Sequence, residues 1–231
     1  METGAAMRML TIIPTRGRND NAIRLFEAIN ATADFTEVIF AIDADDVKTY
    51  QGLMNETAGL DNVKVCIADR MGMNGTLNHW ALWFSPDYDY ICFMGDDHLP
   101  RTGGWDTKLA EAIGKEPGIA YGNDLLQGQN LPTAVVMSSK IIRATGYMSP
   151  PALKHLFLDN YWLAIGNALG NVTYLPEVII EHMHYLNGKA EHDERYAAVN
   201  NPEMHNGDQA IFAEYMASQF AIDVENVQDW V

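Results

Sequence analysis

Short apolar runs with the length of buried β-strands alternate with segments of helical periodicity along the first half of this chain. The first run, Met9 to Pro14, is followed by apolar residues at helical spacing over residues 19–30. Further strand-like runs occupy residues 37–42, 62–68 and 88–94. A helix between two strands returns the chain to the same end of the sheet, so successive strands run parallel. We therefore expect an α/β fold whose central, mostly parallel sheet is flanked by helices.

The length and composition favour one domain. The chain has 231 residues and is 48% hydrophobic, which is enough to build one substantial core. No repeat, low-complexity tract or linker divides it, so we expect a single domain over residues 1–231. The strand–helix alternation is regular over about residues 8–105 and looser over about residues 106–231.

In the second half, the predicted helices and strands do not alternate regularly. The patterns predict helices over residues 106–114, 138–146 and 153–169 and strands over residues 133–137 and 178–181. Residues 187–206 are polar and aperiodic, so we expect a flexible loop there, with Gly188 and Gly207 as hinges.

The charge balance limits the partners. Fifteen basic residues against 31 acidic ones give a net charge of −16, which repels a phosphate backbone. We therefore expect no broad binding of nucleic acid. No run approaches the roughly 20 apolar residues that a membrane-spanning helix needs, and the first residues lack a signal-peptide pattern. We expect no membrane span and a cytoplasmic location.

Polar or acidic segments follow each of the four strand-like runs of the first half. These segments are Thr15-Arg16-Gly17-Arg18, Asp43-Ala44-Asp45, Asp69-Arg70 and Asp96-Asp97-His98. The carboxyl ends of parallel strands share one edge of a sheet, where α/β proteins bind their ligands. The four segments are therefore expected to surround one crevice.

The last of these segments has the composition of a metal site. Asp96 and Asp97 supply hard oxygen ligands of the kind that suit Mg²⁺ or Mn²⁺, and His98 adds an imidazole. The alternative is a solvated acidic turn beside a hinge at Gly95. The common nucleotide-binding signatures GxxxxGK[ST] and GxGxxG are absent, so the sequence does not support a P-loop or a dinucleotide-binding function.

Four segments in order resemble the nucleotide-sugar glycosyltransferases of the GT-A fold, especially the large family-two group. The segment Thr11 to Arg18 is similar to that family's first strand and nucleotide loop, and Ala41 to Asp46 to its second strand. Met73 to Asn78 resembles its Asn/Gly-rich segment beside the diphosphate, and Gly95 to His98 its DxD-type motif. The resemblance covers residues 9–105 well and the rest loosely. It implies one GT-A-like, Rossmann-like domain with a nucleotide-binding half and an acceptor-side half.

The resemblance also implies a donor site and a divalent metal, Mn²⁺ or Mg²⁺. The residues expected at a nucleoside-diphosphate sugar are Thr15, Arg16, Arg18, Asp43, Asp45, Arg70, Asn74, Gly75 and Asp96. A strict DxD motif has a carboxylate where this chain has His98, so the ligand could be any of Asp96, Asp97 and His98; we favour Asp97 first and His98 second. A later histidine often completes the site in this family, and His182 or His184 matches that role. The alternative is a pair of surface histidines.

The implied activity is transfer of a sugar, expected from a UDP-linked donor, to an acceptor hydroxyl. Asp159 matches the acceptor-side carboxylate that acts as general base in inverting members, although a solvated helix Asp is the simpler interpretation. We expect inversion, while the motif with His98 also resembles retaining members. The competing functions are a nucleotidyltransferase, a noncatalytic nucleotide-sugar-binding module and a metal-dependent hydrolase. The acceptor, whether glycan, protein, modified base or small molecule, is not specified by the sequence.

Overall fold

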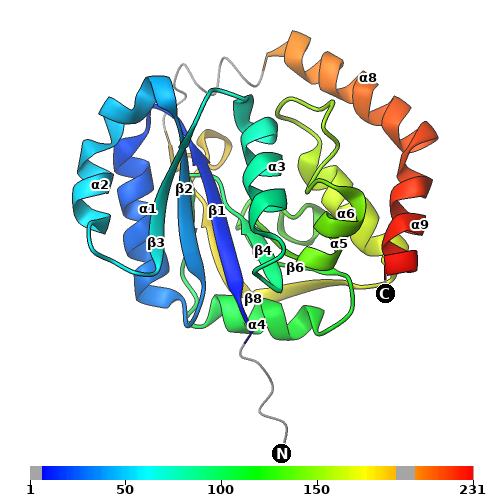
Figure 1. Ribbon diagram of the computed structural model, residues 1–231, viewed down its shortest axis with the longest axis horizontal. Helices are drawn as coiled ribbons and strands as arrows, with labels where there is room; N and C mark the ends of the chain where they lie inside the picture. The colour runs from blue at the N-terminus through cyan, green and yellow to red at the C-terminus, as the bar shows by residue number, and fades with distance from the viewer. Residues whose placement is uncertain (1–6, 191–200, 231) are drawn as a thin grey trace, which may run out of the picture.

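A single curled sheet forms the centre of the computed structural model, which describes residues 7–190 and 201–230 (Figure 1). Within these residues the sheet has eight strands in the order β3-β2-β1-β4-β7-β6-β8-β5. The strands are β1 (Met9–Thr15), β2 (Glu37–Asp43), β3 (Val63–Ala68), β4 (Tyr90–Phe93), β5 (His98–Pro100), β6 (Ile119–Asn123), β7 (Val135–Ser138) and β8 (Val172–His182).

Most neighbouring strands run parallel, as the alternation of strands and helices predicts. β1 pairs in parallel with β2 and β4, and the pairs β2–β3 and β6–β8 are also parallel. β7 runs antiparallel to both of its neighbours, β4 and β6, and β5 runs antiparallel to β8. The expected α/β fold with a mostly parallel sheet is therefore confirmed.

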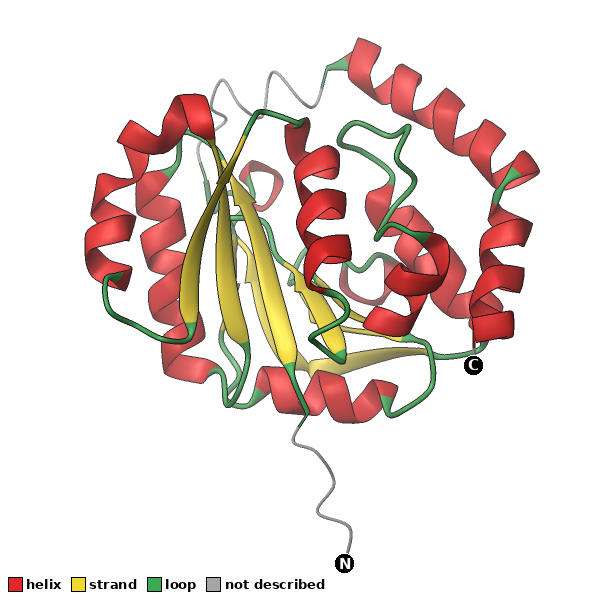
Figure 2. Cartoon of the chain, in the orientation of Figure 1, coloured by secondary structure: helices red, strands yellow, loops and turns green. Residues whose placement is uncertain are grey.

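Helices cover both faces of the sheet (Figure 2). They are α1 (Asn19–Thr32), α2 (Gln51–Thr57), α3 (Gly72–Phe84), α4 (Trp105–Ile113), α5 (Ser139–Thr145), α6 (Leu158–Leu169), α8 (Pro202–Ser218) and α9 (Phe220–Trp230). Side chains of α1, α2 and α4 form one hydrophobic core with one face of the sheet, while those of α3, α5, α6 and α9 form a second core with the other. No helix among the described residues is both long and apolar enough to cross a membrane.

The two cores follow from the twofold side-chain alternation of the strands. In β1, Met9 and Ile13 belong to the first core, whereas Leu10 and Ile12 belong to the second. Every one of these four side chains is almost completely buried. A strand that is apolar on both faces needs a helix layer on each side, which is why the run Met9 to Pro14 shows no alternation of polar residues.

Several element boundaries differ from the sequence predictions. β5 and β6 are not predicted at all, and β8 is longer than the expected strand over residues 178–181. α3 begins at Gly72, so the Asn/Gly-rich segment Met73 to Asn78 lies within a helix. α6 begins at Leu158 rather than residue 153. The missed strands are short and carry little periodicity, and a glycine at a helix start resembles a loop.

The expected loop over residues 187–206 is wrong at its carboxyl end. Residues 191–200 lie outside the described part of the chain, but α8 already begins at Pro202. Gly207 therefore lies inside a helix and is not a hinge. The Asn201 side chain accepts a hydrogen bond from the Met204 N–H and caps this helix, a signal that the polar composition concealed.

Three buried aspartates each accept hydrogen bonds from three consecutive backbone N–H groups. Asp106 binds those of residues 34–36, Asp124 those of residues 126–128, and Asp208 those of residues 154–156. A buried carboxylate is stable only when hydrogen bonds replace its hydration. Asp106 and Asp208 therefore each join a loop to a distant element, whereas Asp124 holds the turn that directly follows it. The last two residues lie beside the cavity described below.

Replacing Asp106 with alanine is expected to lower the free energy of unfolding by about 3 kcal/mol, because three backbone N–H groups, that of Thr36 buried, lose their acceptor. Chemical denaturation monitored by circular dichroism measures this change. Asp61→Ala, at an exposed position, is the control and should change stability by less than about 0.5 kcal/mol. Equal stabilities for the two variants would contradict the structural role of Asp106.

Candidate functional site

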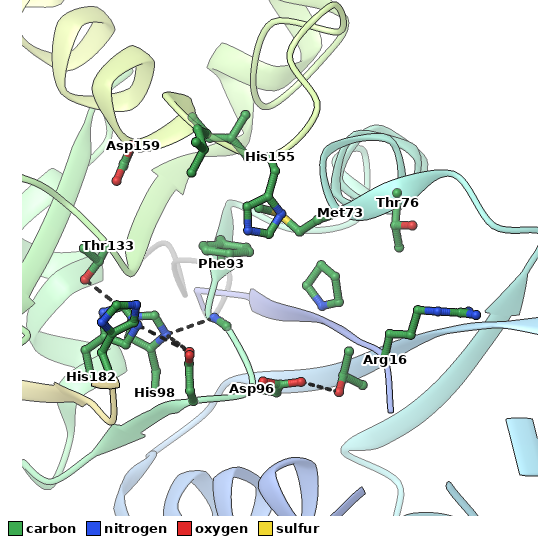
Figure 3. A pocket seen from close by; sticks show the side chains of 18 of the residues that line it. Arg16, Met73, Thr76, Phe93, Asp96, His98, Thr133, His155, Asp159 and His182 are labelled. Atoms are coloured by element: carbon green, nitrogen blue, oxygen red, sulfur yellow. Dashed lines mark hydrogen bonds and ion pairs between the residues drawn. The ribbon is translucent and has the colours of Figure 1, made fainter. Parts of the chain in front are cut away.

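A cavity of about 590 Å³ lies at the carboxyl ends of β1, β2 and β4 (Figure 3). One wall comes from these strand ends and includes Thr15, Asp43 and Phe93. The opposite wall comes from the segment before and at the start of α6 and from the end of β8, and it includes Asp159 and His182. The crevice thus lies at the edge of the sheet where the strand-end rule expects it.

Asp97, His98 and His182 meet in this cavity. One ligand atom from each lies within 4.8 Å of those of the other two, an arrangement able to hold a metal ion. The Asp97 Oδ1 atom is 3.5 Å from the His98 Nδ1 atom and 3.5 Å from the His182 Nε2 atom. The two imidazole rings stack with centroids 4.2 Å apart, and Figure 3 shows them side by side below Thr133.

Strand pairing brings these three residues together. In the antiparallel pair β5–β8, His98 lies directly opposite His182, so both side chains leave the same face. The end of β8 is also fixed on its other side. The Met183 N–H donates to the Asp97 carbonyl at 2.7 Å, and the His182 N–H donates to the Asp124 carbonyl at 3.0 Å. Residues 85 positions apart in the sequence therefore share one site.

Gly95 makes room for this arrangement. A Cβ atom at this position would lie 2.8 Å from the Asp97 Oδ1 atom and 3.1 Å from the His98 Nδ1 atom, closer than real side chains approach. The Gly95 N–H also donates to the His98 Nδ1 atom at 3.1 Å. A larger residue here would therefore displace the side chains of Asp97 and His98.

The donor set fits a divalent metal. Burial, together with the neighbouring His182, lowers the pKa of His98 to about 3, although Asp97 and Asp124 oppose the shift, so the imidazole is neutral as a metal ligand must be. The Nδ1 atom of His182 is buried and has no hydrogen-bond partner among the described residues. One carboxylate and two imidazoles suit Mn²⁺ and other first-row metals better than Mg²⁺, which prefers oxygen ligands.

Two residues that the sequence offered as metal ligands stand apart from this group. The Nδ1 atom of His184 accepts a hydrogen bond from the Leu186 N–H, and its ring centroid is 5.0 Å from that of His182. Asp96 instead accepts hydrogen bonds from the Thr15 hydroxyl at 2.6 Å and from Arg18 at 3.3 Å. The structure thus groups His182 rather than His184, and Asp97 rather than Asp96, with His98.

Asp96 ends a chain of hydrogen bonds at the floor of the cavity. The Arg18 N–H donates to the Tyr50 hydroxyl at 3.2 Å, and that hydroxyl contacts the Thr15 hydroxyl at 2.8 Å. Burial, reinforced by the adjacent Asp97, raises the pKa of Asp96 to about 6, although Thr15 and Arg18 oppose the shift. Tyr50 is not among the site residues predicted from the sequence, because nothing in its sequence context marks it as more than part of a helix.

The remaining charged residues expected at a donor form a group of ion pairs that is partly exposed to solvent. Arg16 pairs with Asp43 at 2.8 Å and with Asp45, and the Arg70 Nε atom is 4.0 Å from Asp43. Arg16, Asp43 and Arg70 line the cavity, but Asp45 does not. Asp45 therefore acts on the site through its ion pair with Arg16, which does line the cavity.

Asn74 and Gly75 are not on the cavity wall. Asn74 is 1% exposed, and its amide donates to the carbonyls of Pro150 and Leu153. Its neighbours Met73 and Thr76 on α3 line the cavity instead. The placement of Asn74 disagrees with the expected diphosphate contact, because the helix turns this amide toward the protein interior.

Asp159 lies on the wall opposite the strand ends, in the first turn of α6. Burial raises the pKa of its carboxyl to about 6, although hydrogen bonds from the Asn160 and Asp159 N–H groups oppose the shift. Figure 3 shows the side chain on the same side of the cavity as Thr133 and His182. The carboxylate therefore shares a cavity with the candidate metal group.

The wall before Asp159 is held by α8. Asp208 accepts the N–H groups of residues 154–156, and Phe157 stacks on Phe212 with ring centroids 5.5 Å apart. Phe157 has a φ of 65°, a left-handed conformation that a non-glycine residue adopts only when its surroundings enforce it. The sequence did not indicate this anchoring, because its two parts lie some 50 residues apart.

Sequence comparison finds no matching family model and no matching curated protein. Solved structures do match. A mannosyltransferase of Pyrobaculum calidifontis, in complex with GDP-Man and Mn²⁺, has 14% identity and a TM-score of 0.59, with 98% of this chain and 74% of that chain covered. Glucosyl-3-phosphoglycerate synthase of Mycobacterium tuberculosis, in complex with Mn²⁺, UDP and phosphoglyceric acid, has 12% identity and a TM-score of 0.55, with 80% and 75% covered.

S. aureus TarS 1–349 in complex with UDP has 14% identity and a TM-score of 0.59. This match covers 75% of the present chain and 59% of that chain, so the present chain spans less than two thirds of TarS 1–349 in this alignment. Identities this low establish the fold alone. Together with the strand order, the matches show that the chain has the GT-A-like fold of the nucleotide-sugar glycosyltransferases.

Proposed function

We propose that the chain is a metal-dependent glycosyltransferase that moves a sugar from a nucleoside-diphosphate sugar to an acceptor hydroxyl with inversion. The observation that carries this proposal is the convergence of Asp97, His98 and His182 in one cavity with the partly buried carboxylate of Asp159. The structural neighbours were solved with UDP, UDP-GlcNAc or GDP-Man, and two of them with Mn²⁺. These ligands support a sugar-nucleotide donor, for which we expect a UDP-linked form.

Asp97, His98 and His182 would hold the cation, with Mn²⁺ favoured over Mg²⁺ by the two imidazoles. Such a cation, when bound, neutralises charge that develops on a diphosphate leaving group. The chain adds its own cations along the cavity. Arg16, Arg18 and Arg70 line the strand-end wall, where guanidinium groups form charge-assisted hydrogen bonds with phosphate oxygens.

Asp159 is the proposed general base. As the acceptor oxygen forms its bond to the anomeric carbon, the bond from that carbon to the diphosphate oxygen breaks, and the acceptor proton passes to the Asp159 carboxylate. A raised pKa makes this carboxylate a stronger base than an exposed Asp. The apolar residues Phe157, Leu158 and Trp162 line the same wall and restrict water there.

The class of donor is tested by thermal shift with UDP, GDP and their sugar conjugates, with and without Mn²⁺. A ligand that binds only the folded chain raises its melting temperature. We expect a rise with a nucleoside diphosphate that is larger when Mn²⁺ is present, followed by release of the diphosphate when an acceptor mixture is added. The absence of any rise with every nucleotide tested would contradict the proposal.

The metal site is tested by single substitutions. Asp97→Ala and His182→Ala are expected to weaken Mn²⁺ binding by more than about 100-fold, because each removes one of three protein ligands. Isothermal titration calorimetry measures the affinity. His184→Ala is the matched control, since this neighbouring histidine stands outside the group, and it should retain wild-type affinity within about threefold. A larger loss in His184→Ala than in His182→Ala would reverse the assignment.

The role of Asp159 predicts a pH dependence. A general base works only when deprotonated, so kcat should fall about tenfold per pH unit below a pKa of about 6 and level off above it. Asp159→Asn should lower kcat by at least about 100-fold while the thermal shift with donor and Mn²⁺ persists. Asn160→Ala, which alters the neighbouring partly exposed amide, serves as the control. An unchanged kcat in Asp159→Asn would remove this residue from the mechanism.

A further inference from the structure

The His182 ring has one nitrogen turned toward the candidate metal group and one turned away from it. Its Nε2 atom lies 3.5 Å from Asp97 Oδ1, whereas its Nδ1 atom lies 4.0 Å from the Oδ2 atom of Asp124. The Nδ1 atom is buried and has no hydrogen-bond partner among the described residues. A buried nitrogen without a partner is costly, and the nearby acceptor is a carboxylate.

The Asp124 carboxylate is firmly held and presents one oxygen to the histidines. Its Oδ1 atom accepts the backbone N–H groups of residues 126–128, at 2.7 to 2.9 Å. Its Oδ2 atom accepts the Thr133 hydroxyl at 2.8 Å, and that hydroxyl oxygen is 3.4 Å from the His98 Nε2 atom. The Asp124 carboxylate therefore lies beside His182 and is linked to His98 through the Thr133 hydroxyl.

The carboxylate is also kept ionised. Four donors, the N–H groups of residues 126–128 and the Thr133 hydroxyl, surround its two oxygen atoms and stabilise the charged form. An ionised carboxylate accepts hydrogen bonds and donates none. Any proton between Asp124 and His182 must therefore belong to the imidazole.

We propose that Asp124 is a positioning residue that fixes the tautomer and the orientation of His182 for metal binding. The inference rests on the metal site of the proposed function but not on sugar transfer. A neutral imidazole carries one N–H group, and the nitrogen that lacks it is the one able to bind a metal. With the proton on Nδ1 and directed at Asp124, the lone pair of Nε2 faces Asp97.

Asp124→Asn separates this role from the loop-anchoring role of the same side chain. The amide oxygen of the asparagine can still accept the N–H groups of residues 126–128. The amide NH₂ then takes the place of Oδ2, so a donor faces the His182 Nδ1 atom. The imidazole must accept at Nδ1 and carry its proton on Nε2, the tautomer that cannot bind a metal through Nε2.

The first measurement is Mn²⁺ affinity by calorimetry on the full chain. Asp124→Asn is expected to weaken binding by about 10- to 100-fold, as loss of the group behind a metal-binding histidine usually does. Asp106→Asn is the matched control, since Asp106 also accepts three consecutive N–H groups but lies away from the cavity. It should lose comparable stability and keep wild-type affinity.

The second measurement needs no metal. Long-range ¹H–¹⁵N correlation spectra, recorded about two pH units above the ordinary histidine pKa, report which ring nitrogen of His182 carries the proton. The proton is expected on Nδ1 in the wild type and on Nε2 in Asp124→Asn, with His182→Gln identifying the signal. This readout keeps the test decisive if Asp124→Asn is also less stable.

Three outcomes would overturn the inference in distinguishable ways. Wild-type affinity in Asp124→Asn would overturn it alone and leave the metal site standing. An Nε2-protonated ring in the metal-free wild type would do the same. Absence of Mn²⁺ binding by the wild type would overturn the metal site of the proposed function, and the inference with it.

Discussion

The antiparallel pairing of β5 with β8 is the contact on which the site depends. This pairing sets His98 opposite His182, and the Met183 N–H bound to the Asp97 carbonyl fixes the third member of the group. A shift of one residue in this register would turn His182 away, because alternate residues of a strand face opposite sides. β5 is only three residues long, so its hold on β8 relies on the neighbouring loops.

Local periodicity was sufficient to predict the first half of the fold. Strands β1 to β4 are buried on both faces, which gives continuous apolar runs, and the helices between them carry clear apolar stripes. The rule that ligands bind beyond the carboxyl ends of parallel strands then placed Asp43 and Asp97 beside one cavity. Those inferences needed only the order of elements along the chain.

The remainder depends on contacts that sequence patterns do not encode. The choice between His182 and His184 is decided by register in a strand whose partner, β5, has no periodicity of its own. Asp124 follows β6, a strand that was not predicted from the sequence, so the strand-end rule could not be applied to this residue. The position of Asn74 also depends on tertiary contacts, since only these show that its amide faces inward.

The cavity wall gathers four basic side chains beside four carboxylates, whereas acidic residues dominate the molecule as a whole. Arg16, Arg18, Arg70 and Lys154 line it, whereas the chain has a net charge of −16. An anionic ligand is therefore repelled at a distance and attracted only at close range. Dissolved salt weakens the distant repulsion more than the short-range contacts, since screening grows with separation. Moderate ionic strength would consequently hasten the arrival of such a ligand, in contrast to proteins whose overall field guides anions inward.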